Sequence, residues 1–320
     1  MSNRQIERTY IRVPPRSGKS TFGRFLFAVK TAVLSPIFAV AASFTSVPGM
    51  RFRARCFRLG LRALFSLNRR LPLTTIFDLL FMPMDSTRYF EFDFAWSTLV
   101  ACPGGRYLDV SSPRLLPVTL LDRRADLVAD LLNPDPKDLA HTARLVSLLS
   151  ADSRCRLHQL VISDAAFDVG GFDVISSISV LEHIPEDVDA LRQIWSFLKP
   201  GGTLVLTVPC MARASEQFID RNDWGVLEAD EDGQVFWQRY YDQTLLEQRI
   251  FNIIGAPERI SVFGETVAGA FLANATSKRA NPYYPYWREP YMVAREYRYF
   301  SSVDELPGEG VIGMVFVKPA

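Results

Sequence analysis

The residues best suited to chemistry stand where predicted strands end. His183 and its neighbour Glu182 come at the end of an apolar run, residues 172–181, of the kind found in strands buried on both faces of a parallel sheet. A histidine titrates near neutrality, so His183 is the best-placed group to take the proton of an alcohol acceptor. Asp109 ends a shorter apolar run, and Asp130 lies 21 residues later. An acid about 20 residues beyond a first-strand motif can bind both ribose hydroxyls of a nucleotide.

The elements around His183 form a strand–helix–strand unit. Pro185 and the two acids after it suit the start of a helix, and apolar residues then recur at helical spacing from Leu191 to Leu198. The sequence KPGG at 199–202 ends this helix, and a second apolar strand follows at 203–208. A crossover of this kind predicts an α/β domain with a parallel sheet.

The predicted sheet continues on both sides of this unit. Its further strands are expected at residues 107–110, 127–132, 156–162, 258–263 and 310–317. Helices are expected at 136–150 and 235–252, and a long loop at 210–234. Residues 281–300 are rich in Tyr, Trp and Phe, and packing of these rings over a sheet edge is favoured over a ligand site.

Charge is unevenly distributed along the 320 residues. Residues 1–75 carry 14 Lys and Arg and a single acid, Glu7, whereas the remainder carries 22 basic and 34 acidic residues. The basic first quarter indicates a negatively charged partner: anionic lipid, a phosphorylated substrate, nucleic acid or the chain's own acidic domain. Four cysteines without paired or metal-ligand spacing favour thiols in a reducing compartment, and no metal site is predicted.

The first quarter divides into three parts. Residues 1–22 are polar and basic and are expected to form a loose arm. Residues 23–44 are apolar, but their best segment, 32–44, has 13 residues where a membrane span needs roughly 20. An interfacial position is therefore favoured over packing on the domain, over spanning and over a signal peptide. Arginines recur on one helical stripe within 51–70 beside apolar faces, which favours a membrane-interface helix slightly over a docked one, and nucleic acid least.

Three stretches together carry a family resemblance: FDVI at 172–175, SVLEHI at 179–184 and LKPGGTLVLTVP at 198–209. They resemble the fourth and fifth strands of class I S-adenosylmethionine (SAM)-dependent methyltransferases. The resemblance implies a Rossmann-like doubly wound sheet of about seven strands with the last strand antiparallel, and it implies SAM as the cofactor.

The resemblance also divides the chain. It implies a methyltransferase-like domain over residues 84–320, with acceptor-side insertions at 210–234 and 281–300. Residues 1–83 are then a basic, apolar helical extension, and residues 23–70 are the part expected to meet an anionic membrane.

The turn after the first strand is where this family binds its cofactor. It normally reads acid-x-Gly-x-Gly-x-Gly, and the glycines let the backbone approach the methionyl part of SAM closely. Here the acid is kept as Asp109, whereas the glycine positions hold Ser111, Pro113 and Leu115. Ser111 and Ser112 are small enough to permit close approach.

Other predicted site residues follow from the same resemblance. Ser163-Asp164-Ala165 matches the acid-plus-small pair that holds the adenine amino group, and an RYFEF-like lead places Arg88 at the methionine carboxylate. The predicted cofactor residues are Arg88, Asp109, Ser111, Ser112, Pro113, Asp130, Leu131, Asp164, Ala165, Ser177 and Ser179. The predicted catalytic residues are His183 and Glu182.

The expected reaction is methyl transfer to oxygen or nitrogen, in which the protein aligns the acceptor and excludes water. Some methyltransferases of glycan and envelope biosynthesis share the RYFEF-like lead, an LDVSSP-like first turn and a WQRYYD-like helix. With the basic first quarter, this predicts a sugar or lipid-linked acceptor and a cytoplasmic enzyme held at the inner membrane face. Two alternatives remain: an inactive methyltransferase-like scaffold, suggested by the missing glycines, and another α/β enzyme that binds a nucleotide sugar.

Overall fold

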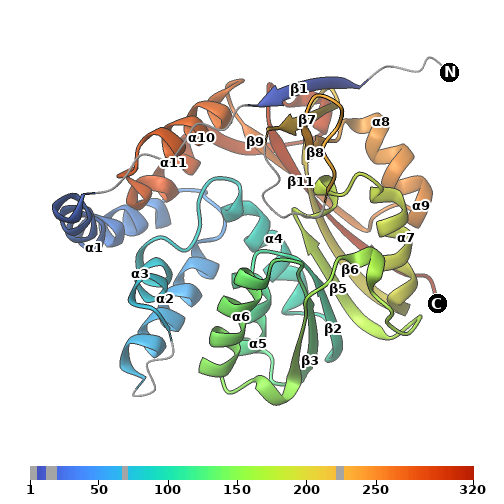
Figure 1. The fold of residues 1–320 in the computed structure, drawn as a ribbon, viewed down its shortest axis with the longest axis horizontal. Coiled ribbons are helices and arrows are strands. Elements are labelled where there is room, and N and C mark those ends of the chain that lie inside the picture. Colours follow the sequence, from blue (N-terminus) through green and yellow to red (C-terminus); the bar gives the residue numbers. More distant parts are fainter. Residues whose placement is uncertain (1–5, 12–19, 67–70, 221–226) are drawn as a thin grey trace.

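A computed structural model describes residues 6–11, 20–66, 71–220 and 227–320, and it is organised around one eight-stranded sheet (Figure 1). The strand order is β10-β9-β11-β6-β5-β2-β3-β4. The bounds are β2 Gly105–Val110, β3 Leu127–Leu132, β4 Cys155–His158, β5 Phe172–Ile178, β6 Leu198–Cys210, β9 Arg259–Glu265, β10 Tyr297–Phe300 and β11 Gly310–Val317.

The pairing confirms the predicted doubly wound sheet and its antiparallel last strand. β4, β3, β2, β5 and β6 pair in parallel, and β11 lies between β6 and β9 and runs antiparallel to both. The sheet has one strand more than the seven expected, because β10 adds to the edge, antiparallel to β9. The predicted cover of the sheet edge therefore holds for the last four residues of the aromatic segment, which form β10, whereas Tyr283, Trp287 and Tyr291 contact helix α1 (Thr21–Ser43).

Helices cover both faces of the sheet, because alternate residues of each strand point to opposite sides. In β2, Tyr107 joins the core beneath α4 (Arg88–Leu99), α5 (Leu115–Arg123) and α6 (Pro136–Leu148). Leu108 joins the opposite core, beneath α7 (Asp187–Phe197), α8 (Gln243–Leu246) and α9 (Asn252–Ile254). The apolar runs read from the sequence are thus buried on both faces, which is what a central parallel strand requires.

A second, three-stranded sheet stands beside the carboxyl end of β6, and it corrects three predictions. It consists of β1 (Glu7–Ile11), β7 (Ser215–Ile219) and β8 (Val235–Tyr240) in the order β1-β7-β8. Part of the expected loose arm is therefore a strand, parallel to β7, and part of the expected loop is β7 itself. Residues 235–240, expected in a helix, form β8 because Val, Phe, Trp and Tyr favour a strand that pairs with β7. The helix begins after Asp242, which caps the Leu245 amide.

Three helices make up most of the remaining first quarter: α1 (Thr21–Ser43), α2 (Met50–Phe65) and α3 (Leu73–Phe81). Two more, α10 (Ala270–Ala280) and α11 (Glu289–Glu296), lie before β10, and α1 packs against α11. α1 extends over 23 residues, beyond the best apolar segment at 32–44, because the helix begins at Thr21, and Pro36 does not interrupt it. Among the described residues, α1 is the one helix that is long and apolar enough to cross a membrane. Core helices of soluble proteins and signal sequences meet the same criterion.

One apolar face of α2 packs on the domain, whereas Phe57, Leu64 and Phe65 are exposed. Phe52, Cys56 and Leu59 are buried, and the Phe52 ring lies 4.8 Å from that of Phe92 in α4. On the arginine stripe, residues 51, 58 and 62 are exposed to solvent, and residue 69 lies outside the described residues. α2 is therefore docked on the domain through one face, and contact of its exposed basic face with a membrane stays a prediction.

Candidate functional site

A pocket of about 710 Å³ opens at the carboxyl ends of the central parallel strands. Val110 at the end of β2, Asn133 after β3, Val161 after β4 and Ser179 after β5 all line it. This is the position at which open α/β sheets bind their ligands, because the loops that follow the strands meet there.

The structure divides the predicted site residues into two groups. The pocket is lined by Arg88, Ser111, Ser112, Pro113, Ser179 and His183. Outside its lining lie Asp109, Asp130, Leu131, Asp164, Ala165, Ser177 and Glu182. The sequence thus located the loops that line the pocket, but about half of the predicted side chains lie outside its lining.

The turn after β2 keeps its shape without glycine. Ser111 has a φ of +53°, in the left-handed region that glycine occupies easily and serine rarely. Its hydroxyl donates to the Leu132 carbonyl at 3.0 Å, and the Ser112 hydroxyl accepts from the Ile178 amide at 3.0 Å. These bonds tie the turn to β3 and β5, and they hold a conformation that costs a non-glycine residue about 1–2 kcal/mol.

Asp109 supports this turn from below. Its carboxylate accepts from the Ser112 amide at 3.0 Å, the Tyr107 hydroxyl at 3.0 Å and the Ser176 hydroxyl at 2.6 Å. Burial raises the pKa of Asp109 to about 6 although these three donors oppose the shift. The acid of the family motif therefore anchors the turn and does not face the pocket.

Asp130, predicted to bind ribose, lies inside β3 and is buried. Its carboxylate contacts His158 Nε2 at 2.8 Å and Arg106 Nη2 at 3.3 Å. The spacing rule located the right strand, but the apolar run continues to Leu132, so the acid sits two residues before the strand end. Leu131 beside it is likewise buried.

The polar residues of the pocket on this side come from the segment after β3, which the sequence reading missed. Asn133, Asp135 and Asp138 line the pocket. The Asn133 side-chain amide donates to Asp138 at 3.1 Å, and Arg114 forms an ion pair with the same carboxylate. The run NPDP directly after a predicted strand was the available signal, because Asx and Pro residues mark the loop that starts there.

Asp164, which was predicted to bind adenine, lies next to the pocket. It ends the 3₁₀ turn Ile162–Asp164 and is exposed, while its neighbour Ser163 lines the pocket. Ala165 is buried, and its carbonyl accepts from Gln193, another lining residue, at 2.9 Å. A ligand that fills the pocket therefore meets Ser163 and Gln193 here.

Arg88 brings a positive charge to the pocket from the first turn of α4. It pairs at 2.8 Å with Glu91, which is fully buried and also accepts hydrogen bonds from Ser179 and Thr207. Ser179 itself has a φ of +50°. The helix is thus tied to the end of β5 through Glu91. Tyr89, by contrast, is buried and packs in the core.

His183 lies in the 3₁₀ turn Leu181–His183 and lines the pocket. Its Nδ1 lies 2.5 Å from the Trp237 carbonyl oxygen in β8. Because a carbonyl only accepts, Nδ1 carries the proton and Nε2 is the basic nitrogen. Burial lowers the pKa of His183 to about 4, so the ring is neutral at pH 7 and able to accept a proton.

Glu182 lies beneath His183, with its carboxyl oxygen 3.8 Å from Nε2. Burial first, and then the charge of Glu91, raise the pKa of Glu182 to about 8. Among the described residues its Oε2 has no hydrogen-bond partner. The two predicted catalytic residues are therefore adjacent, and at pH 7 both are uncharged.

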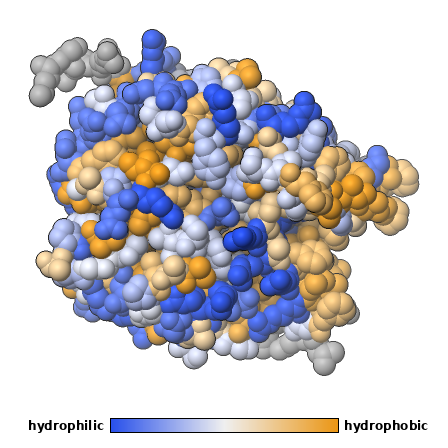
Figure 2. All heavy atoms as spheres, turned by 180° about the vertical axis from the view of Figure 1, so that it is seen from behind, coloured by the Kyte–Doolittle hydropathy of each residue, from blue (hydrophilic) through white to orange (hydrophobic). Residues whose placement is uncertain are grey.

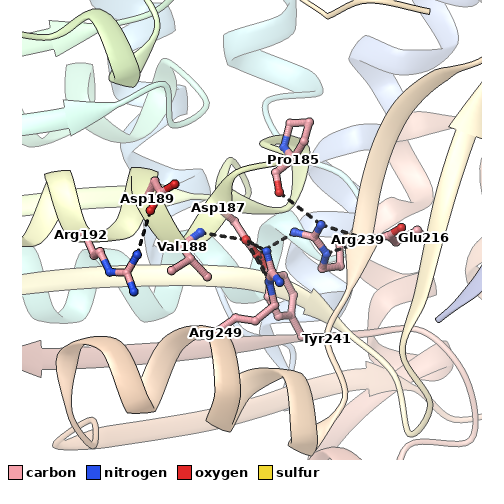
Figure 3. Close-up of polar contacts among 9 residues, drawn as sticks. All are labelled: Pro185, Asp187, Val188, Asp189, Arg192, Glu216, Arg239, Tyr241 and Arg249. Atoms are coloured by element: carbon pink, nitrogen blue, oxygen red, sulfur yellow. Dashed lines mark hydrogen bonds and ion pairs between the residues drawn. The ribbon is translucent and has the colours of Figure 1, made fainter. Parts of the chain in front are cut away.

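A buried charge cluster fixes β8 beside this pair (Figure 3). Asp187, at the start of α7, lies between Arg239 of β8, Arg249 and the Tyr241 hydroxyl, as Figure 3 shows. Arg239 also pairs with Glu216 of β7 at 3.0 Å. The strand that supplies the Trp237 carbonyl is thus held to the main domain by charge.

The residues of the pocket fit SAM. The volume lies within the range of small-molecule sites. Arg88 suits a carboxylate, and the carboxylates and amide after β3 suit ribose hydroxyls. Among the described residues no group of three or more His, Cys, Asp or Glu could hold a metal ion.

Strand order and pocket together define a class of protein. A parallel sheet with an antiparallel strand inserted beside its last parallel strand, and a pocket at the carboxyl ends, is the architecture expected of class I methyltransferases. Residues 102–252 match a family described as a methyltransferase domain. The match covers a little less than half of the chain. Together with the fold, it supports the predicted similarity to class I SAM-dependent methyltransferases and SAM as the cofactor.

Curated relatives match part of the chain. A ubiquinone biosynthesis O-methyltransferase of Xanthomonas campestris pv. campestris (strain B100) is 37% identical over 109 residues, 34% of this chain and 44% of that protein. The protein of that name from Xanthomonas euvesicatoria pv. vesicatoria (strain 85-10) is 34% identical over 112 residues, 35% of this chain and 46% of that protein. The chain thus spans less than half the length of the curated relatives it matches.

Solved structures align over more of the chain but at low similarity. The MccD protein aligns with a TM-score of 0.49 at 10% identity, over 72% of this chain and 96% of that one. Geranyl diphosphate C-methyltransferase from Streptomyces coelicolor A3(2) aligns with a TM-score of 0.46 at 12% identity, over 73% and 80%. At such values the alignments carry no argument about activity or substrate.

Proposed function

We propose that this chain transfers the methyl group of SAM to an oxygen acceptor bound beside His183. The observation that carries the proposal is the position of His183 in the pocket, neutral and with its tautomer set by the Trp237 carbonyl. When bound, SAM supplies an activated methyl group on its sulfonium. Nothing in the pocket has to make the methyl donor reactive, so the residues position the acceptor and take its proton.

In the proposed reaction, the acceptor oxygen forms a bond to the methyl carbon while the bond from that carbon to sulfur breaks. The hydroxyl proton passes to Nε2 of His183, and S-adenosylhomocysteine leaves. Arg88, Ser111 and Ser112 line the pocket. Arg88 would hold the carboxylate of the cofactor, and the turn at Ser111 and Ser112 would lie against its methionyl part. Glu182, protonated at neutral pH, keeps a negative charge away from the basic nitrogen.

For the acceptor, we propose a hydroxyl of a sugar or lipid-linked precursor at the cytoplasmic face of the membrane. The names of the curated relatives favour oxygen over nitrogen. The basic first quarter and the exposed apolar side chains of α1 favour an acceptor that is held at a lipid surface.

Calorimetric titration with S-adenosylhomocysteine tests the cofactor site. We expect saturable binding by the full chain, weakened at least tenfold in Arg88→Gln because a charge-assisted hydrogen bond of about 1.5–3 kcal/mol is lost. Glutamine keeps a donor for Glu91, so the fold is retained. Arg62→Gln is the control, since Arg62 forms an exposed pair with Asp122.

The same titration separates the alternatives. No binding of S-adenosylhomocysteine by folded protein would overturn the proposal in favour of an inactive scaffold. A rise in melting temperature with NAD or a nucleotide sugar, and none with SAM, would indicate another nucleotide-binding enzyme. With binding established, methyl transfer from radiolabelled SAM to lipid-linked glycans and to hydroxylated aromatic lipids identifies the acceptor.

A further inference from the structure

Helix α1 presents its large apolar side chains away from the protein. The exposed ones recur at helical spacing along one stripe: Phe22, Phe25, Leu26, Val29, Val33, Ile37, Val40 and Phe44. Phe22 is 75% exposed at one end of the stripe, and Phe44 is 87% exposed at the other. The helix has 23 residues and is therefore about 34 Å long, so the stripe runs along its whole length.

The side of α1 that faces the protein combines small, fully buried residues with the half-buried rings of Phe27 and Phe38. Its buried residues are Thr31, Ser35 and Ala42. The Ser35 hydroxyl accepts from Arg53 at 2.6 Å and donates to the Phe81 carbonyl at 2.7 Å. Helices at the surface of soluble proteins keep their apolar residues toward the core, whereas α1 carries a second apolar stripe on its outer side. α1 is therefore built to meet an apolar medium on its outer side.

Contacts along the helix hold it flat against the domain. Near its start, the Ser20 amide donates to the Tyr283 hydroxyl at 2.9 Å. Further along, the Phe27 ring packs on Trp287 at 5.7 Å between centroids, and Phe38 packs on Tyr291 at 6.0 Å. A helix docked in this way offers only its outer face to a bilayer, so its geometry suits insertion in the plane of the membrane and not across it.

The surface around the stripe completes a membrane-binding face. In Figure 2 the hydrophobic surface of α1 projects at the right and continues down the same edge of the molecule. Exposed apolar residues of α2 and of the start of α3 are Phe57, Leu64, Phe65 and Leu73. Exposed basic residues of α1 and α2 are Arg24, Lys30, Arg51, Arg58 and Arg62. The sequence has no acid between Glu7 and Asp78, so α1 and α2 add no negative charge to this face, although Asp122 of α5 pairs with Arg62.

We propose that α1 is an in-plane membrane anchor that inserts its outer stripe into the interface of an anionic bilayer. A lipid surface is the occupant that both features require, because acyl chains match the continuous apolar stripe and anionic head groups match the flanking arginines and lysine. The inference deepens the proposed function by naming the partner at which the acceptor is met, and its test needs no enzymatic activity.

Flotation of the full chain with preformed vesicles tests the anchor. We expect binding to vesicles of phosphatidylcholine and phosphatidylglycerol at about 3:1, and at least fivefold less binding to phosphatidylcholine alone. The double variant Val33→Asp/Ile37→Asp should bind at least tenfold less, since both residues lie in the stripe and each is 58% exposed. Val169→Asp is the matched control, because Val169 is 79% exposed and lies outside the stripe. This variant should bind vesicles as the unaltered protein does.

Three outcomes would overturn the inference. Equal flotation of the double variant would remove the stripe from membrane binding. Resistance of the bound protein to alkaline carbonate extraction would indicate a spanning helix. A dimer that Val33→Asp/Ile37→Asp converts to a monomer, with no flotation of the unaltered protein, would show that a second copy covers the stripe. Binding of S-adenosylhomocysteine, measured on the same samples, should be unchanged, so a failure here is distinguishable from a failure of the proposed function.

Discussion

Asp187 and Arg239 form a buried ion pair, with 2.7 Å between Oδ2 and Nη1, that joins the start of α7 to β8. Their side chains are 1% and 6% exposed, and Arg249 binds the same carboxylate from another side. β8 also carries Trp237, whose carbonyl fixes the tautomer of His183. A charge pair outside the pocket lining therefore controls the geometry of the proposed base.

Replacing Arg239 with methionine should lower both stability and turnover. Removing one partner of a buried pair costs about 3–5 kcal/mol because the other charge stays buried, and Arg249 should keep the loss near the lower figure. We expect a loss of about 3 kcal/mol in urea unfolding and a fall in kcat with the KM for SAM within about twofold. Arg192→Met is the control: its pair with Asp189 is exposed, so a change of about 0.5 kcal/mol or less is expected. Equal effects of the two variants would contradict the positioning role.

Replacing His183 with asparagine should separate proton transfer from cofactor binding. Asparagine keeps a donor for the Trp237 carbonyl but has no basic nitrogen. We expect kcat to fall by about 10²–10⁴ while the affinity for S-adenosylhomocysteine stays within threefold. In the unaltered enzyme, a pKa of about 4 predicts that protonation of His183 limits the rate only when the pH falls toward 4. His141→Asn serves as the control, and a loss of less than threefold in His183→Asn would assign catalysis to positioning alone.

The variants Ser111→Val and Ser150→Val compare the left-handed turn of the pocket with a matched site elsewhere. Ser111 and Ser150 have φ values of +53° and +55°, but only Ser111 lines the pocket. A β-branched residue is strained in this region, so each substitution should destabilise the protein by about 1–2 kcal/mol. Only Ser111→Val should also weaken binding of S-adenosylhomocysteine, by about tenfold or more. Equal affinity in the two variants would mean that the turn does not hold the cofactor.

The sequence predicted those features in which local pattern and topology agree. Apolar runs located every strand of the central sheet except β10, and the segment before His183 located the pocket. β8 was missed because VFWQRY alternates poorly and its pairing partner β7 lies in a stretch that reads as a loop. The partner of His183, the Trp237 carbonyl, was out of reach, since a backbone acceptor from a distant strand leaves no pattern in the chain.

The roles of Asp130 and Asp138 can be distinguished by whether their substitution lowers stability or cofactor affinity. Asp130→Asn weakens a buried contact with His158 and Arg106, and we expect a loss of about 1–3 kcal/mol in stability with little change in affinity for S-adenosylhomocysteine. Asp138→Asn changes a lining residue and should weaken that affinity about tenfold. Urea unfolding and calorimetry on both variants decide the matter. The reverse result would return the ribose role to Asp130, as its spacing from Asp109 predicted.

Glu182 should make the protein less stable as the pH rises. Burial raises its pKa from 4.5 to about 8, so between these values the folded state binds a proton that the unfolded state has released. The free energy of unfolding therefore falls with rising pH, by a contribution that approaches about 1.4 kcal/mol per pH unit. Glu182→Gln has no proton to lose, so its stability relative to the unaltered protein should improve between about pH 5.5 and 7.5.

Urea unfolding at about pH 5.5, 6.5 and 7.5 measures that gain, and Glu247→Gln is the control because Glu247 is exposed. Asp109 and Glu309, with pKa values raised to about 6 and about 7, act in the same direction in every variant, so only the difference between curves reports on Glu182. His183 acts oppositely: its pKa is lowered from 6.5 to about 4, which makes stability rise with pH in that interval. Parallel curves for Glu182→Gln and the unaltered protein would show that Glu182 is ionised in the folded state, and a charged carboxylate would then lie 3.8 Å from the proposed base.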